Sequence, residues 1–237
     1  MRLDKYLADA GIGSRSDVKD LIRKGRITIN GLPIKNNDYK LNTEQDMICF
    51  DSFPVKYQKF VYYMLNKPSG VVSATNDNTC KTVIDLLNAE NRKNLFPVGR
   101  LDKDTTGLLL ITDDGEFSHK ILSPKKHVPK TYLALLDGKL NKTEKLRIEQ
   151  GIDIGDETIT LPAVLHYESP DSNLIRITIT EGRYHQVKRM FYAVGKNVVS
   201  LKRIQIGALK LDETLNAGSY RQLTENEISL CFDRTFK

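Results

Sequence analysis

The spacing of apolar residues changes near residue 53 and divides the chain into two parts. Before this point apolar residues recur three and four positions apart, as in amphipathic helices. From Phe60 onward most of them form short runs of strand length, bounded by turn residues. The intervening stretch contains Pro54 and several polar residues, which is typical of a linker. We therefore predict a small domain at 1–52, a linker at 53–59 and a large domain at 60–237.

The small domain is predicted to contain two helices and a short sheet. Leu3, Leu7 and Ala10 have helical spacing. Ser14 is a good N-cap for a second helix, and Asp17 follows it at capping-box distance. The expected strands are 27–29 and 47–50. A domain of this size buries only a marginal core. We therefore expect a neighbouring domain or a ligand to stabilise it.

The large domain is predicted to be α+β, because strand and helix patterns alternate irregularly along it. The strand-like segments are 60–65, 108–112, 131–136, 158–167, 174–180 and 203–211. The helical segments are 82–87, 116–122, 142–149 and 184–194. This order indicates a mostly antiparallel mixed sheet flanked by helices.

Composition narrows the class of protein. The chain carries 36 Lys and Arg against 30 Asp and Glu, a net charge of +6, which permits an anionic partner without demonstrating one. Its three cysteines form no Cys-x-x-Cys pair, which argues against a disulfide framework or a thiolate zinc site. No apolar run approaches the roughly 18 residues of a membrane span, and acidic residues interrupt any signal peptide. We expect a cytoplasmic protein with no membrane contact and no bound metal.

The second predicted helix has one strongly basic face. Arg15, Lys19, Arg23 and Arg26 fall three or four positions apart, opposite the apolar stripe, and Lys24 adjoins them. Such a face is either a solvated helix surface or a surface that follows RNA phosphates. The residues alone leave both interpretations open.

A glycine-bounded loop at 99–107 holds Arg100, Asp102 and Asp104 just before the apolar run 108–111. A loop anchored by a buried strand can hold a charged side chain rigidly and still leave it accessible. The spacing of acids also fits a calcium loop. We reject that interpretation, because Gly99 breaks the helix that such a loop needs before it and no Glu occupies its last position.

The predicted helix at 184–194 combines an apolar stripe with a basic face. Val187, Met190 and Phe191 recur at helical spacing and are expected in the core. Glu181 is the single acid between residues 181 and 210, so we expect RNA contacts along this stretch. The residues assigned to that role are Arg183, His185, Arg189, Lys202 and Arg203.

Four ordered motifs resemble those of the RsuA-type pseudouridine synthases. They are Leu-Asn-Lys-Pro-Ser-Gly at 65–70, Gly-Arg-Leu-Asp-x-Asp-Thr-x-Gly-Leu-Leu-Leu at 99–110, Lys-Thr-Tyr-Leu-Ala at 130–134 and Glu-Gly-Arg-Tyr-His-Gln-Val-Lys-Arg-Met at 181–190. In front of them, residues 14–31 resemble the S4 RNA-binding domain. The resemblance implies an S4-like RNA-binding domain followed by a catalytic domain.

The resemblance also implies roles for individual residues. Asp102 matches the catalytic aspartate, Tyr132 the tyrosine that stacks on the target base, and Lys188 the cation that pairs with the aspartate. Arg100 matches a residue that fills the space left by the extruded uridine, and Leu201 an apolar residue near the aspartate. Lys188 is a departure, since related enzymes often carry Arg there, which can bind a carboxylate in a bidentate manner.

The implied reaction is the isomerisation of a uridine to pseudouridine in small-subunit ribosomal RNA, at uridine 516 in the usual bacterial numbering. It needs no cofactor, because nothing is oxidised and no group donor takes part. A carboxylate can serve as a nucleophile at C1′ or assist deprotonation at C2′. The expected partner is ribosomal RNA, free or within an assembly intermediate, and the expected state is a monomer.

Two other functions remain open on the residues alone. The chain could be a non-catalytic S4-type RNA-binding protein that assists ribosome assembly. It could also be a metal-dependent phosphodiesterase that uses the acids of the central loop and of the turn after it, namely Asp102, Asp104, Asp113 and Asp114.

Overall fold

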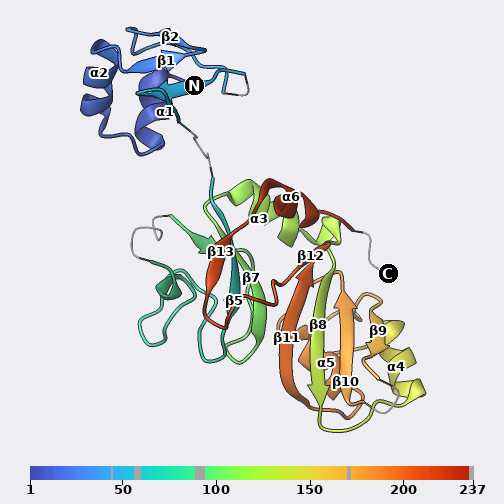
Figure 1. Cartoon of the computed structure of the whole chain (residues 1–237). Helices are drawn as coiled ribbons and strands as arrows, with labels where there is room; N and C mark the ends of the chain where they lie inside the picture. The colour runs from blue at the N-terminus through green and yellow to red at the C-terminus, as the bar shows by residue number, and fades with distance from the viewer. Residues whose placement is uncertain (44, 56–59, 89–93, 170–171, 235–237) are drawn as a thin grey trace. The chain divides into compact units, whose positions relative to one another are not determined.

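The computed structural model describes residues 1–43, 45–55, 60–88, 94–169 and 172–234. The chain divides into two compact units, Met1–Lys59 and Phe60–Lys237 (Figure 1). Both contain helices and sheet, so the predicted α+β class is confirmed. No helix among the described residues is long and apolar enough to cross a membrane.

The first unit packs two helices on a four-stranded sheet of order β2-β1-β3-β4. Its elements are α1 (Leu3–Asp9), α2 (Arg15–Arg23), β1 (Ile27–Ile29), β2 (Leu32–Pro33), β3 (Ile48–Phe50) and β4 (Phe53–Pro54). The predicted cap of α2 is present, because Ser14 accepts a hydrogen bond from the Asp17 amide and the Asp17 carboxylate accepts one from the Ser14 amide. Leu3, Leu7 and Ile22 are fully buried between the helices and the sheet.

The predicted linker starts too early. Phe53 and Pro54 form β4 and pair with β3, so they belong to the sheet of the first unit. The Val55 amide also donates a hydrogen bond to the carbonyl of Ile48. The remainder of the predicted linker, 56–59, lies outside the described residues.

The second unit is built on a nine-stranded mixed sheet. Its strands are β5 (Tyr62–Lys67), β6 (Phe96–Pro97), β7 (Thr106–Thr112), β8 (Lys130–Leu136), β9 (Val164–Tyr167), β10 (Leu174–Ile179), β11 (Val198–Ile206), β12 (Leu209–Lys210) and β13 (Tyr220–Gln222). The order is β13-β5-β7-β11-β8-β10-β9, with β6 on β7 and β12 on β11. The β7–β11 pair is parallel and the other pairs described are antiparallel, which confirms the predicted mixed sheet.

Helices cover parts of both faces of this sheet (Figure 1). They are α3 (Gly115–Leu122), α4 (Lys142–Glu149), α5 (Gln186–Tyr192) and α6 (Glu225–Leu230), with 3-10 turns η1 (Ile84–Leu86) and η3 (Pro124–Lys126). On one face, residues of α3 and the end of α6 share a core with Met64, Leu108 and Leu110. On the other face, α5 packs in a core that contains Leu109 and Ile111. The apolar run before residue 112 is therefore buried on both sides of the sheet.

Some predicted elements differ from the structure. The strand expected at 158–167 begins only at Val164, because Thr160 instead bonds through its amide and its hydroxyl to Ile152. The helix expected at 82–87 is only the short turn η1. The strand expected at 203–211 starts earlier, at Val198, and a turn at Gly207 separates it from β12. Neither β13 nor α6 was predicted.

Gly107 allows β7 to approach β11 at the parallel pair. Its φ is +96°, a conformation that residues with a side chain rarely adopt. A Cβ placed there would lie 2.2 Å from the carbonyl oxygen of Arg203 on β11. Both the backbone conformation and the contact therefore require glycine at this position.

We predict that Gly107→Ala lowers the free energy of unfolding by at least about 2 kcal/mol, because it combines backbone strain with a backbone clash. Urea unfolding of the full chain measures this loss. Gly115→Ala is the matched control, since a Cβ at Gly115 meets nothing within 4 Å and the residue lies in α3. Equal stability of the two variants would contradict the assignment.

Candidate active site

The loop that carries Asp102 is fixed by two side chains, one from the last residue of β5 and one from the segment after it. Lys67 is fully buried, and its Nζ donates hydrogen bonds to the carbonyl oxygens of Pro68, Asp102, Lys103 and Thr105 at 2.9–3.2 Å. The hydroxyl of Ser73 donates to the Leu101 carbonyl at 2.9 Å and accepts from the Leu101 amide at 3.0 Å. Because backbone atoms on both sides of Asp102 are held, its carboxylate is presented from a rigid base.

The buried ammonium of Lys67 titrates below its ordinary range. Burial lowers the pKa of Lys67 to about 8, although the nearby carboxylates of Asp104 and Asp102 oppose this shift. The group is therefore still mostly an ammonium at neutral pH. Several carbonyl oxygens and no hydrogen-bonded carboxylate surround it, so its role is to hold the loop's backbone.

Lys188 of α5 lies between the two acids of the loop. Its Nζ is 3.0 Å from Asp102 Oδ2 and 2.6 Å from Asp104 Oδ1. Burial acts to lower the pKa of Lys188, but the hydrogen bonds to Asp104 and Asp102 outweigh it and raise the value. The same bond from Lys188 lowers the pKa of Asp104. Asp102 also faces His185, whose Nε2 is 3.4 Å from Asp102 Oδ1.

The predicted stacking tyrosine and the predicted apolar neighbour of Asp102 both lie in the core of this unit. Tyr132 on β8 and Leu201 on β11 are buried, and they share one core with Leu101 and Val187. Leu101 directly precedes Asp102 in the chain and Val187 directly precedes Lys188, so the core anchors both charged residues. The Leu201 carbonyl also accepts a weak hydrogen bond from the hydroxyl of Thr106, at 3.4 Å.

Arg100 extends the same loop toward solvent. It is exposed, and none of the interactions within the described part of the chain engages its guanidinium. Its position two residues before Asp102 places a free cation next to the candidate site.

Two of the residues predicted to contact RNA, Arg183 and Arg189, bind acceptors within the protein. Arg183 donates hydrogen bonds to the carbonyls of Thr158 and Ile159 and pairs with Glu181. Arg189 pairs with Asp156 at 2.6 Å, and these arginines lower the pKa of that carboxylate, Arg189 more strongly. Their guanidinium groups hold the segment before β9 against the start of α5, a structural role that the sequence did not predict.

The prediction for Arg203 is wrong for a different reason. Its side chain is 3% exposed, and its Nε donates a hydrogen bond to the carbonyl of Leu108 on β7 at 2.8 Å. A group buried in this way cannot follow an RNA backbone. It instead ties β11 to β7 beside their parallel pair.

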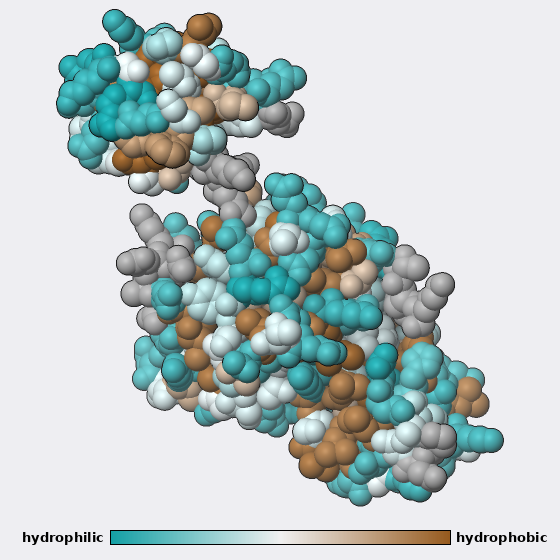
Figure 2. Space-filling model, in the orientation of Figure 1, coloured by the Kyte–Doolittle hydropathy of each residue, from teal (hydrophilic) through white to brown (hydrophobic). Residues whose placement is uncertain are grey.

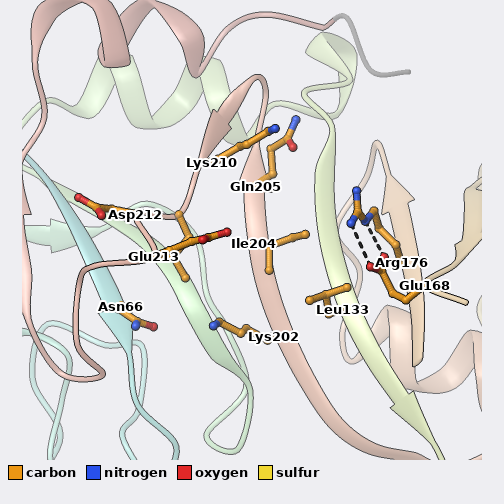
Figure 3. Close-up of a pocket in the computed structure, with 11 residues that line it drawn as sticks. Asn66, Leu133, Glu168, Arg176, Lys202, Ile204, Gln205, Lys210, Asp212 and Glu213 are labelled. Atoms are coloured by element: carbon orange, nitrogen blue, oxygen red, sulfur yellow. Dashed lines mark hydrogen bonds and ion pairs between the residues drawn. The ribbon is translucent and has the colours of Figure 1, made fainter. Parts of the chain in front are cut away.

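Lys202 is exposed but lies away from Asp102. With Asn66 and Leu133 it lines a groove of about 450 Å³ (Figure 3). Side chains alternate along a strand, so Leu133 and Lys202 point to the face opposite Tyr132 and Leu201. Lys202 could therefore meet RNA only on a different face of the sheet from the buried tyrosine.

The basic residues of α2 are all exposed. Hydrophilic side chains gather over this helix in the space-filling view (Figure 2). Arg23 pairs with Asp20 and Arg26 with Asp51. Arg15 and Lys19 instead line a hollow of about 240 Å³ together with Arg2, Asp4 and Lys5. This hollow gives the first unit a place where several cations converge.

The acids after β7 do not join the site. Asp113 accepts a hydrogen bond from the Val61 amide, and Asp114 caps α3 and accepts one from the Tyr62 hydroxyl. The seven residues of β7 separate them from Asp102 by about 20 Å. This geometry contradicts the phosphodiesterase alternative, and no group of three metal-binding side chains was found among the described residues.

The residues that sequence reasoning missed are Lys67 and Ser73. Lys67 lies in the motif at 65–70, to which the resemblance attaches no residue role, and its partners are carbonyl oxygens, which leave no trace in a sequence. A lysine at the end of a strand-like segment is the available indication in the sequence. Asp104, to which the resemblance assigns no role, shares Lys188 with Asp102.

Comparisons with known proteins agree with this architecture. The RNA pseudouridylate synthase family model matches residues 61–193, and the S4 domain model matches residues 1–48. The chain is 46% identical over 233 residues to the uncharacterized RNA pseudouridine synthase YtzG of Bacillus subtilis, covering 97% of this chain and 98% of that protein. It is 44% identical over 231 residues to ribosomal small subunit pseudouridine synthase A of Escherichia coli K12, covering 97% and 99%.

A solved structure is similar over the whole chain as well. The crystal structure of a pseudouridylate synthase superposes with a TM-score of 0.69 at 40% identity, covering 98% of this chain and 99% of that one. The match extends over both the S4 domain and the unit that carries Asp102. The chain therefore belongs to the RNA pseudouridylate synthase family, whose members are isomerases, and it carries an S4 domain in front of the catalytic domain.

Proposed function

We propose that this enzyme converts one uridine of small-subunit ribosomal RNA to pseudouridine, with Asp102 as the reacting carboxylate. The observation that carries the proposal is the rigid placement of Asp102 beside the ammonium of Lys188. The name of the relative from Escherichia coli supports the class of RNA. We assign the position to uridine 516 in the bacterial numbering, and we expect the enzyme to act as a monomer in the cytoplasm.

The proposed chemistry is balanced without a cofactor. The N1–C1′ bond breaks with its electron pair on the uracil, while Asp102 either bonds to C1′ or takes a proton from C2′. The uracil then turns and C5 bonds to C1′, as the Asp102–C1′ bond breaks in the first route or as Asp102 returns the proton to C2′ in the second. C5 finally loses its proton and N1 gains one, so Asp102 is regenerated. Lys188 keeps a positive charge beside the carboxylate and the uracil anion throughout.

Other residues would bind and orient the substrate. Tyr132 would hold the detached uracil by stacking, so that it turns without escaping. Arg100, exposed beside the loop, would fill the space that the extruded uridine leaves and offset part of the unstacking cost of a few kcal/mol. The converging cations of the first unit, Arg15 and Lys19 among them, would follow the phosphate backbone.

We predict that Asp102→Asn lowers the rate of pseudouridine formation by at least about 10³-fold and changes the affinity for RNA by no more than a few fold. The substitution removes the reacting carboxylate and keeps the shape of the side chain. Tritium release from 5-tritiated uridine measures the reaction, and filter binding measures the affinity. Full activity of the variant would overturn the assigned role of Asp102. If the wild-type protein itself released no tritium, the non-catalytic alternative of an assembly protein would be favoured.

Asp104→Asn separates the two acids of the loop. It keeps the Lys188–Asp102 pair but removes the carboxylate that accepts a hydrogen bond from Lys188 and thereby helps to raise the pKa of Lys188. Lys188 must be charged to serve Asp102, so activity should be retained at neutral pH and lost at a lower alkaline pH than in the wild type. The control is Asp104→Glu, which keeps the charge. An unchanged profile of kcat/KM against pH would refute this role.

Lys67→Met tests the backbone anchor of the loop. We expect it to destabilise the protein by about 2–4 kcal/mol, since buried carbonyl oxygens lose their donor, and to reduce kcat by loosening the loop. Urea unfolding and initial rates measure the two effects. Lys103→Met, an exposed lysine on the same loop, should change the stability by less than about 0.5 kcal/mol. Similar effects of both substitutions would contradict the anchoring role.

The RNA position is tested in cells. Pseudouridine mapping of small-subunit ribosomal RNA from cells lacking this protein should show the loss of a single site, at uridine 516. The gene for the wild-type chain should restore the site and the Asp102→Asn variant should not. Loss of a different site would leave the reaction intact and refute the assignment of the position. In vitro, naked RNA and assembly intermediates can then be compared as substrates.

A further inference from the structure

We propose that Tyr184 and His185 form a stacking platform for the base next to the target uridine. This inference rests on the proposed function, because it assumes an RNA substrate whose uridine is extruded toward Asp102. It assigns a binding site to an aromatic pair that the proposed chemistry leaves without a role.

The two rings form one continuous stack that ends at the candidate catalytic carboxylate. Their centroids are 3.9 Å apart and their planes differ by 17°. The inner ring, His185, places Nε2 3.4 Å from Asp102 Oδ1. The outer ring, Tyr184, is 76% exposed. An open aromatic surface therefore lies one ring away from the group that must reach the sugar.

The backbone holds this pair in place before any ligand binds. His185 has φ +49°, a left-handed conformation that is uncommon for a residue with a side chain. Arg189 donates a hydrogen bond to the Tyr184 carbonyl at 3.1 Å, and the Gln186 side chain accepts one from the Arg183 amide at 2.9 Å. Such strain persists only where the surroundings maintain it, and it is common at binding sites.

A nucleic acid base is the ligand that fits this surface. A uridine that leaves the stack to reach Asp102 deprives its neighbour of a stacking partner. An aromatic ring offers a replacement, and it does so for any base, because every base has a π face. The cations around the pair, Lys188 and Arg189, are already engaged by acids, so the platform adds contact area and no net charge.

The chain offers a direct optical test, because it contains no Trp. Tyr184→Trp introduces the protein's single indole at the platform, and Tyr192→Trp does so at a matched tyrosine of α5 that is 74% exposed. We expect substrate RNA to quench the emission of Tyr184→Trp and to leave that of Tyr192→Trp nearly unchanged. Equal responses, or no response at position 184 at RNA concentrations that saturate binding, would overturn the proposal.

A double perturbation identifies the stacked base. Tyr184→Ala should reduce kcat/KM by roughly tenfold, the scale of one lost base–aromatic stack, whereas Tyr184→Phe should retain it and Tyr192→Ala should change it by less than about twofold. RNAs with an abasic site directly 5′ or 3′ of the uridine are then compared. At the position of the stacked base, combining the abasic RNA with Tyr184→Ala should reduce kcat/KM no further than either change alone.

The outcomes separate this inference from the proposed function. If the wild-type enzyme forms pseudouridine but the effects of Tyr184→Ala and of both abasic sites multiply independently, the platform is refuted and the reaction stands. If the wild-type enzyme releases no tritium from the RNA, the proposed function itself fails. Quenching of Tyr184→Trp together with non-additive losses at one flank supports the platform and identifies the side on which the base lies.

Discussion

The bonds from the buried ammonium of Lys67 to the carbonyls of the neighbouring loop are the interaction on which the site depends. Backbone carbonyls at Asp102, Lys103 and Thr105 converge on one cation that has no room to move. With their carbonyl oxygens held by Lys67, Asp102 still leaves its side chain partly exposed and Lys103 leaves its side chain exposed. Burying the ammonium of Lys67 costs free energy, which its hydrogen bonds to the loop offset. The same hydrogen bonds fix the backbone that presents the carboxylate of Asp102.

The strand after the loop extends this constraint into the sheet. Each side chain from Leu108 to Ile111 is buried, alternately in one core and the other. At its start, Gly107 lets β7 approach β11 in the parallel direction, so that the loop before β7 and the start of α5 meet. Asp102 and Lys188 thus come from different halves of the domain, and packing on both faces of the sheet holds the halves in register.

Much of this could be predicted from the sequence, and the exceptions have physical causes. The capped helix α2, the buried run of β7 and the pairing of Asp102 with Lys188 follow from local patterns or from a quoted motif. The roles of Lys67 and Ser73 do not, because both bind backbone atoms, which any residue supplies. The segment before Val164 was predicted as strand from its composition, although its hydrogen bonds go to the loop after α4.

The three arginines that were predicted to contact RNA and that bind protein acceptors share one feature. A run of basic residues in a sequence shows where the cations lie along the chain, but it does not show which hydrogen-bond acceptors they bind. Arg183, Arg189 and Arg203 all find acceptors within the protein, and two of them fix the segment before β9 against the start of α5. Those bonds hold the helix that presents Lys188 and His185 to Asp102. Arg183 and Arg189 thus stabilise the helix that carries the side chains facing Asp102.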